Sequence, residues 1–329
     1  MSDIFHPLVS ILIPCYNAEM WIAQAIESAL NQTYPNKEVI VVDDGSTDRS
    51  LEIIKSFGDS IRWETRSNQG GNVARNRLLE LSTGEWLQYL DADDYLLPDK
   101  IEDQISYLNN NGYETDIIYS PVIVEYPNNN HEKYVSTLPE PDDPWILLIK
   151  WQLPQTGGCL WRKQTIIELG AWKIDQPCCQ EHELYSRFLI GHKNFLYSPK
   201  SGAVYRIFGK NTVSSKRISE TYKRRLEIID RIEKYIEATQ PQNYNTYLEI
   251  IHQNKFECAR IIWNFNEQWA IDIVNNLGTK KTFMPSGNTV PRIYKICYRL
   301  FGFSTSEKLA SAKRFFQSIF KHNYYLIRS

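Results

Sequence analysis

The fold of this 329-residue chain is decided by residues 9–48, which read VSILIPCYNAEMWIAQAIESALNQTYPNKEVIVVDDGSTD. The apolar, β-branched runs at 9–13 and 38–42 predict two buried strands. Between them, apolar residues recur at helical spacing from Trp21 to Leu30, which predicts a helix. A strand, a helix and a second strand at this spacing indicate a βαβ unit and therefore a parallel sheet.

The same alternation continues downstream. Helical patterns cover 46–57 and 72–81, and strand patterns cover 61–65 and 86–90. Right-handed crossovers would place helices on both faces of the sheet. We therefore predict an α/β fold with a Rossmann-like, mostly parallel sheet flanked by helices. From 117 to 161 we expect short strands and a proline-rich stretch, then helices near 163–169 and 181–190 and a closing strand segment at 194–208.

The character of the sequence changes after Ser214. Residues 218–239, 244–265 and 308–320 have helical spacing and few strand signals. We therefore expect an α/β domain over residues 1–210 and a helical, basic C-terminal extension over residues 211–329.

The net charge of −2 conceals an asymmetry along the chain. Residues 280–329 hold ten Lys or Arg and a single acid, Glu307, so they carry +9 and the rest of the chain carries −11. Nothing in the overall charge indicates a nucleic-acid partner. The last helix would gather Leu309, Ala312, Phe316, Ile319 and Phe320 on one face. Such a helix suits an anionic membrane surface, and equally a face packed on the α/β domain or on a second copy.

Several classes of protein are disfavoured by absent motifs. Six scattered cysteines without a CxxC pair argue against a zinc ribbon and favour a reducing cytosol. No apolar run approaches about 18 residues, so we expect a cytoplasmic protein, soluble or peripheral on the membrane face. The lack of both GxGxxG and a P-loop argues against a dinucleotide dehydrogenase and a P-loop NTPase.

Polar clusters follow three of the predicted strands. They are 14–17, 43–48 and 91–94. Because ligands bind beyond the carboxyl ends of parallel strands, we expect these clusters to share one site. Clustered carboxylates are costly unless a cation joins them. The Asp91-x-Asp93 pair suits Mg²⁺ or Mn²⁺ with diphosphate oxygens completing the shell, and Arg75 could add positive charge.

Taken together, seven motifs resemble a family 2 glycosyltransferase with the GT-A fold. They are Val9–Asn17, Asn31–Pro35, Val42–Asp48, Asn68–Gly70, Ala74–Asn76, Gly84–Trp86 and Leu90–Asp94. The resemblance covers residues 8 to about 208. It implies an inverting transfer from a nucleoside-diphosphate sugar, by family habit a UDP-sugar, to a hydroxyl of a saccharide or a lipid-linked saccharide, assisted by Mn²⁺ or Mg²⁺.

The resemblance also implies roles for single residues. Pro14, Tyr16 and Asn17 would line the nucleotide pocket. Asp44 would accept a hydrogen bond from the nucleobase, and Asp43 would support the turn that holds Asp44. Arg75 would contact the nucleotide. Asp91 would touch the ribose or the metal shell, and Asp93 would hold the metal. Arg206 or Lys210 could neutralise diphosphate.

The general base is where this sequence departs from the family pattern. The family commonly shows Glu-Asp before a helix, and the matching stretch here is CCQEHEL at 178–184, with His182 at the Asp position. Three interpretations stay open: His182 is the base, Glu181 is the base while His182 orients the acceptor, or the site is altered. An altered site would make the chain a catalytically silent nucleotide-sugar-binding protein. A nucleotidyltransferase is a further alternative, because it would share the fold and the acid cluster.

Overall fold

The computed structural model describes residues 6–112, 114–129, 131–136, 138, 143–208, 217–277, 283–287 and 290–326, without the side chains of 313 and 315–326. The chain divides into two compact units, Met1–Arg224 and Arg225–Ser329. The boundary predicted near residue 210 lies outside the described residues.

The first unit is built on a seven-stranded sheet with the order β10-β6-β9-β4-β1-β2-β3. The strands are β1 (Val9–Cys15), β2 (Lys37–Asp43), β3 (Arg62–Thr65), β4 (Trp86–Tyr89), β6 (Ile117–Tyr119), β9 (Cys159–Arg162) and β10 (Phe195–Tyr197). β1 pairs in parallel with β2 and β4, whereas β9 runs antiparallel to its neighbours β4 and β6. The predicted mostly parallel α/β sheet is confirmed.

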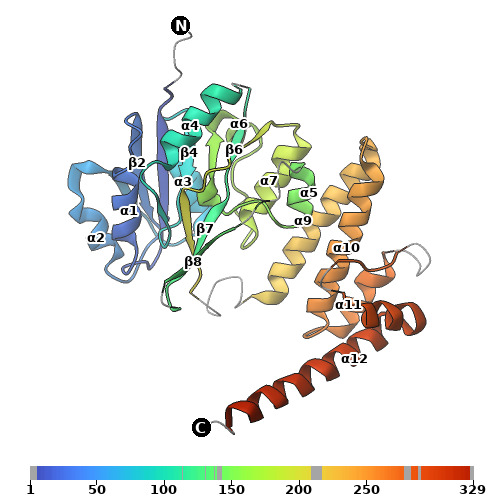
Figure 1. Ribbon diagram of the computed structural model, residues 1–329. Coiled ribbons are helices and arrows are strands. Elements are labelled where there is room, and N and C mark those ends of the chain that lie inside the picture. The colour runs from blue at the N-terminus through green and yellow to red at the C-terminus, as the bar shows by residue number, and fades with distance from the viewer. Residues whose placement is uncertain are drawn as a thin grey trace. The chain divides into compact units, whose positions relative to one another are not determined.

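Helices cover the sheet on both sides (Figure 1). The helices of this unit include α1 (Ile22–Leu30), α2 (Ser50–Ser56), α3 (Gly71–Leu81), α4 (Lys100–Asn111), α5 (Pro144–Ile149), α6 (Lys163–Glu168) and α7 (Gln180–Ile190). Because the residues of β1 are buried on both faces, the strand has no alternating polar positions. The apolar face of α1, with Ile22 and Ile26, packs into the same core.

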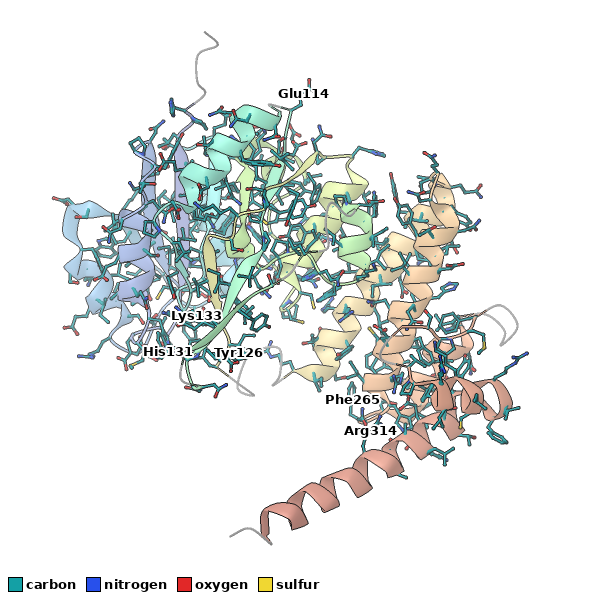
Figure 2. The ribbon with its side chains drawn as sticks, in the orientation of Figure 1. Glu114, Tyr126, His131, Lys133, Phe265 and Arg314 are labelled. Carbon is teal, nitrogen blue, oxygen red and sulfur yellow. The ribbon has the colours of Figure 1, made fainter. Side chains whose placement is uncertain are left out.

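A smaller sheet stands beside the first, with the order β5-β11-β7-β8. Its strands are β5 (Tyr95–Leu96), β7 (Val122–Tyr126), β8 (Glu132–Val135) and β11 (Ala203–Arg206). Figure 2 labels Tyr126, His131 and Lys133 on the β7–β8 hairpin. The segment predicted as one closing strand at 194–208 is in fact two strands, β10 and β11, which belong to different sheets.

Helix α4 was not predicted, although a signal was present. Ile101, Ile105 and Leu108 recur at helical spacing and are buried. The first residue of the helix, Lys100, is also buried and donates to the side chain of Gln88 on β4. This contact ties α4 to the strand that precedes the acid cluster.

The second unit is helical, as expected. It contains the greater part of α9 (Ile218–Thr239), which begins in the first unit, together with α10 (Tyr244–Ile262), α11 (Glu267–Asn275) and α12 (Arg292–Leu326). α12 is interrupted at Gly302, whose φ of 82° departs from the helical range. The side chains of Phe316, Ile319 and Phe320 lie outside the described part, so the predicted apolar face of 308–320 stays a prediction. Among the described residues, no helix is long and apolar enough to span a membrane.

Candidate active site

A cavity of about 590 Å³ lies at the carboxyl ends of β1, β2 and β4. Of the residues expected there, seven line it: Pro14, Tyr16, Asn17, Asp44, Arg75, Asp91 and Asp93. Asp43, Glu181 and His182 do not line it. The three polar clusters therefore share one cavity, as the parallel topology requires.

Asp44 is held by the loop that leads into α3. Its carboxylate accepts hydrogen bonds from the backbone amides of Gln69 (3.1 Å) and Gly70 (2.8 Å). The next residue, Gly45, has φ of 76°, and a Cβ there would lie 2.7 Å from the amide nitrogen of Asn68. Only glycine lets the two loops approach so closely. The turn therefore fixes the Asp44 carboxylate at the wall of the cavity.

Asp43 supports the turn from inside. Its carboxylate accepts from Thr65 Oγ1 at 2.7 Å and from the amide of Ser46 at 3.2 Å. Asn17 links the first two clusters, since its side-chain oxygen accepts from the amide of Thr47 at 2.8 Å. These contacts make the first two strand ends one rigid wall of the cavity.

Arg75 brings a positive charge to the cavity from the second turn of α3. Its guanidinium donates to Asp91 Oδ1 at 2.7 Å and to Asn72 Oδ1 at 3.3 Å. It also lies over the ring of Trp172, at 5.2 Å from the centroid. The buried Nε atom of Arg75 has no hydrogen-bond partner among the described residues. Arg75 therefore brings a positive charge and an unsatisfied donor to the wall of the cavity.

The carboxylates of Asp91 and Asp93 crowd together at the end of β4. Burial and the neighbouring charge of Asp91 raise the pKa of Asp93 to about 6. Within the described ranges, no group of three or more His, Cys, Asp or Glu side chains surrounds a metal position. Two carboxylates on an open cavity nevertheless fit Mg²⁺ or Mn²⁺, because these ions take one or two protein carboxylates and complete the shell with water and phosphate.

Arg206 is committed to the fold rather than to the cavity. Its guanidinium lies 4.7 Å from the ring centroid of Trp21 and 4.5 Å from that of Tyr95, and it donates to Glu125 at 3.1 Å. Its backbone amide donates to the buried Asp94 at 2.8 Å. These contacts tie β11 to the acid cluster. The other cation expected near diphosphate, Lys210, lies outside the described residues.

Sequence reasoning missed part of the cavity wall. Trp21, Asn68, Gly71, Phe208 and Arg217 line it as well. Phe208 reaches it from the far end of β11 and packs on Trp21 with a centroid separation of 4.9 Å. Because Arg217 is far along the chain from the motifs, no local pattern indicated it. It is an exposed cation at the wall.

The two candidate bases begin α7 and have different surroundings. The ring of His182 stacks on Trp151, with centroids 3.9 Å apart and planes within 8°. Its Nδ1 lies 3.6 Å from Glu181 Oε1, and neither ring nitrogen has a hydrogen-bond partner among the described residues.

Glu181 is influenced mainly by burial and by its neighbour His182. Burial alone would raise its pKa, but His182 and, more weakly, Arg75 outweigh that effect and hold the pKa below its usual value. Burial and the surrounding carboxylates, Glu181 and Asp93 among them, raise the pKa of Tyr205. His182 therefore contacts both Trp151 and Glu181.

Comparison with known proteins agrees with this geometry. Residues 10–167 match the model of the family described as Glycosyl transferase family 2. An uncharacterized glycosyltransferase of Haemophilus influenzae is 36% identical over 220 residues, which are 64% of this chain and 83% of that protein. The chain spans about a third of the length of two similar Rickettsia glycosyltransferases. The protein is therefore a glycosyltransferase, and it belongs to family 2.

Solved structures show the same fold at low sequence identity. Staphylococcus aureus TarS 1–349 in complex with UDP-GlcNAc is 16% identical, with a TM-score of 0.66 over 93% of this chain and 91% of that one. The mannosyltransferase PcManGT from Pyrobaculum calidifontis, in complex with GDP-Man and Mn²⁺, is 14% identical, with a TM-score of 0.53 over 94% and 81%. The GT-A fold expected from the sequence is thus confirmed.

Proposed function

We propose that this glycosyltransferase moves a sugar from a nucleoside-diphosphate sugar, with UDP as the favoured nucleotide, to a hydroxyl of a saccharide or lipid-linked saccharide, with inversion. The observation that carries the proposal is the cavity at the strand ends, where Asp44, Arg75 and Asp93 meet. The cavity offers a hydrogen-bond acceptor for the nucleobase, a cation for the phosphates and carboxylates for a divalent ion. The complexes of TarS with UDP-GlcNAc and of PcManGT with GDP-Man support this class of donor.

The donor would lie along the cavity from the first two strand ends to the third. Pro14, Tyr16 and Asn17 would enclose the nucleoside, and Asp44 would accept a hydrogen bond from the base. Arg75 would bind phosphate oxygens through its guanidinium. Arg217 adds a second cation at the same wall.

Asp93, with Asp91, would hold Mn²⁺ or Mg²⁺ next to the diphosphate. When bound, the ion would act as a Lewis acid that stabilises the negative charge of the departing nucleoside diphosphate. The raised pKa of Asp93 comes from burial and from the neighbouring charge of Asp91, and a bound cation would relieve both effects.

We propose Glu181 as the general base and His182 as the group that positions it. The acceptor oxygen attacks the anomeric carbon as the bond from that carbon to the phosphate oxygen breaks, and Glu181 takes the acceptor's proton. A single displacement of this kind inverts the anomeric centre and needs one base. Glu181 is favoured because the ring of His182 stacks on Trp151 and its Nδ1 lies 3.6 Å from Glu181 Oε1, so that His182 can orient the carboxylate.

The test is a screen of nucleotide sugars by thermal shift in the presence of Mn²⁺, followed by product analysis. A true donor should raise the melting temperature according to RT ln(1 + [L]/Kd). Turnover that releases nucleoside diphosphate supports the proposal. Release of inorganic diphosphate would indicate a nucleotidyltransferase, and binding without turnover of any acceptor would indicate a catalytically silent protein.

A further inference from the structure

The first part of α12 presents a row of apolar side chains to solvent. Ile293 is 73% exposed, Ile296 59%, Leu300 63% and Phe301 61%. At 100° of rotation per residue, these positions fall within an arc of about 140° on the helix before the break at Gly302. We call these four residues the α12 stripe. It precedes the 308–320 segment whose apolar pattern was noted from the sequence.

The stripe is not the face that holds α12 in its own unit. Tyr294 and Tyr298 are buried and pack on Phe256 of α10, with centroid separations of 6.2 and 5.5 Å. Beyond the break, Phe303 packs on the same ring at 5.7 Å. Because these aromatic contacts already anchor the helix, the stripe is left as an outward surface. Contiguous apolar surface of this kind marks an interaction site.

Almost all of the charged residues on α12 itself are cations. From Arg292 to Arg314 the only acid is Glu307, which is 0% exposed. Its carboxylate accepts from Arg260 Nε at 2.6 Å and from the Tyr294 hydroxyl at 2.7 Å. The internal contacts thus remove the one negative charge from the surface. The cations of the segment are Arg292, Lys295, Arg299, Lys308, Lys313 and Arg314, the last of which is labelled in Figure 2.

Three of the cations on α12 lie together along one edge of the stripe, where they could face a negatively charged surface. Arg292, Lys295 and Arg299 fall within about 60° of one another on the helix, next to the Ile296 edge of the stripe. Arg292 and Arg299 are exposed. Apolar residues beside a row of Lys and Arg suit the boundary between lipid headgroups and acyl chains. A second copy fits less well, because two such surfaces would bring like charges together.

We propose that the α12 stripe and its flanking cations dock this protein on an anionic lipid surface. The stripe inserts its four apolar side chains between headgroups, while Arg292, Lys295 and Arg299 pair with lipid phosphates. Docking at this surface would place the enzyme beside hydroxyls carried on lipids.

The experiment is co-sedimentation of the full chain with phosphatidylcholine vesicles that contain or lack phosphatidylglycerol. We expect strong binding only to the anionic vesicles, weakened by high salt. The Ile293→Glu/Leu300→Glu variant should bind at least roughly tenfold more weakly. The matched control is Ile174→Glu, since Ile174 is also 73% exposed but belongs to the first unit.

The Arg292→Gln/Arg299→Gln variant gives a second test that leaves the stripe intact. It should reduce binding to anionic vesicles and leave any residual binding to neutral vesicles unchanged. The proposal is overturned if the wild-type chain does not sediment with anionic vesicles, or if the stripe variant binds as the wild type does. It is also overturned if light scattering shows a dimer that the stripe variant dissociates while vesicle binding is unaffected.

Discussion

Arg75 on α3 and Asp91 at the end of β4 form a 2.7 Å ion pair at the wall of the cavity. The pair joins a helix to a strand end that is 16 residues away in sequence. It keeps Arg75 and Asp91 together at the wall of the cavity that Asp93 also lines. The cation and the acids of the site are thus set in place before any donor binds, which reduces the reorganisation that binding requires.

Replacement of Arg75 by Ala should weaken donor binding by about 10- to 100-fold, because a charge-assisted hydrogen bond contributes roughly 1.5–3 kcal/mol. Calorimetric titration with the nucleotide sugar found in the thermal-shift screen measures the effect. Arg77→Ala is the control, since Arg77 lies on the same helix and pairs with Glu64 and Glu80 at the surface. Equal effects of the two variants would argue against a ligand contact by Arg75.

Asp93→Asn should remove most of the dependence of donor binding and turnover on Mn²⁺. The physical reason is that one of the two carboxylates able to hold the ion is lost. Removal of metal with EDTA should reduce turnover of the wild-type enzyme by roughly 100-fold or more, and added Mn²⁺ should restore it. Asp59→Asn, at an exposed acid in the same unit, is the control. Full activity of the wild type in EDTA would contradict the metal assignment.

Glu181→Gln should lower kcat by about 100- to 10,000-fold while the KM for the donor changes little. This variant keeps the shape of the side chain and removes its ability to take a proton. His182→Gln should have a smaller effect, since His182 acts through Glu181. Steady-state kinetics distinguishes the two. If His182→Gln abolishes turnover and Glu181→Gln does not, His182 is the base.

The pH profile provides an independent test of the same pair. Activity needs the Glu181 carboxylate ionised, so turnover falls as pH falls through its pKa. His182 holds that pKa below its usual value. His182→Asn should therefore move the acid limb of kcat/KM to higher pH. His192→Asn, at an exposed position beyond the end of α7, should leave the limb in place. An unmoved limb in His182→Asn would show that His182 does not act on the base.

Lys100 should make the stability of the protein depend on pH. Burial lowers the pKa of this amine to about 7, against its ordinary value near 10.5 in the unfolded chain. Between these values the unfolded state binds more protons, so stability rises with pH, by up to about 1.4 kcal/mol per unit. Below pH 7 this gain is absent.

Urea denaturation between pH 6 and about 10 measures the slope that Lys100 adds. Lys100→Met should reduce it, because the variant has no amine to protonate at that position. Lys55→Met, at an exposed lysine, should leave the slope unchanged. A slope that is the same in wild type and Lys100→Met would show that the amine stays charged in the folded state.

The fold was predictable to the extent that its signals are local. The buried runs that became β1 and β2 and the helix between them appear directly in the apolar periodicity. Helix α4 had the same kind of signal in Ile101, Ile105 and Leu108 but was not identified. The division of 194–208 into β10 and β11 was not predictable, because it depends on which distant strands are free to pair with each half.

The sequence by itself determined the family, the α/β alternation and the three polar clusters after β1, β2 and β4, since strand periods and turn residues are encoded within a few neighbouring positions. Only the tertiary structure separated adjacent side chains with similar chemistry. Asp44 lines the cavity while Asp43 is used inside the turn, and the ring of His182 stacks on Trp151 while Glu181 lies beside it. Neighbouring residues point in different directions, and what each one meets depends on chain segments far away in sequence.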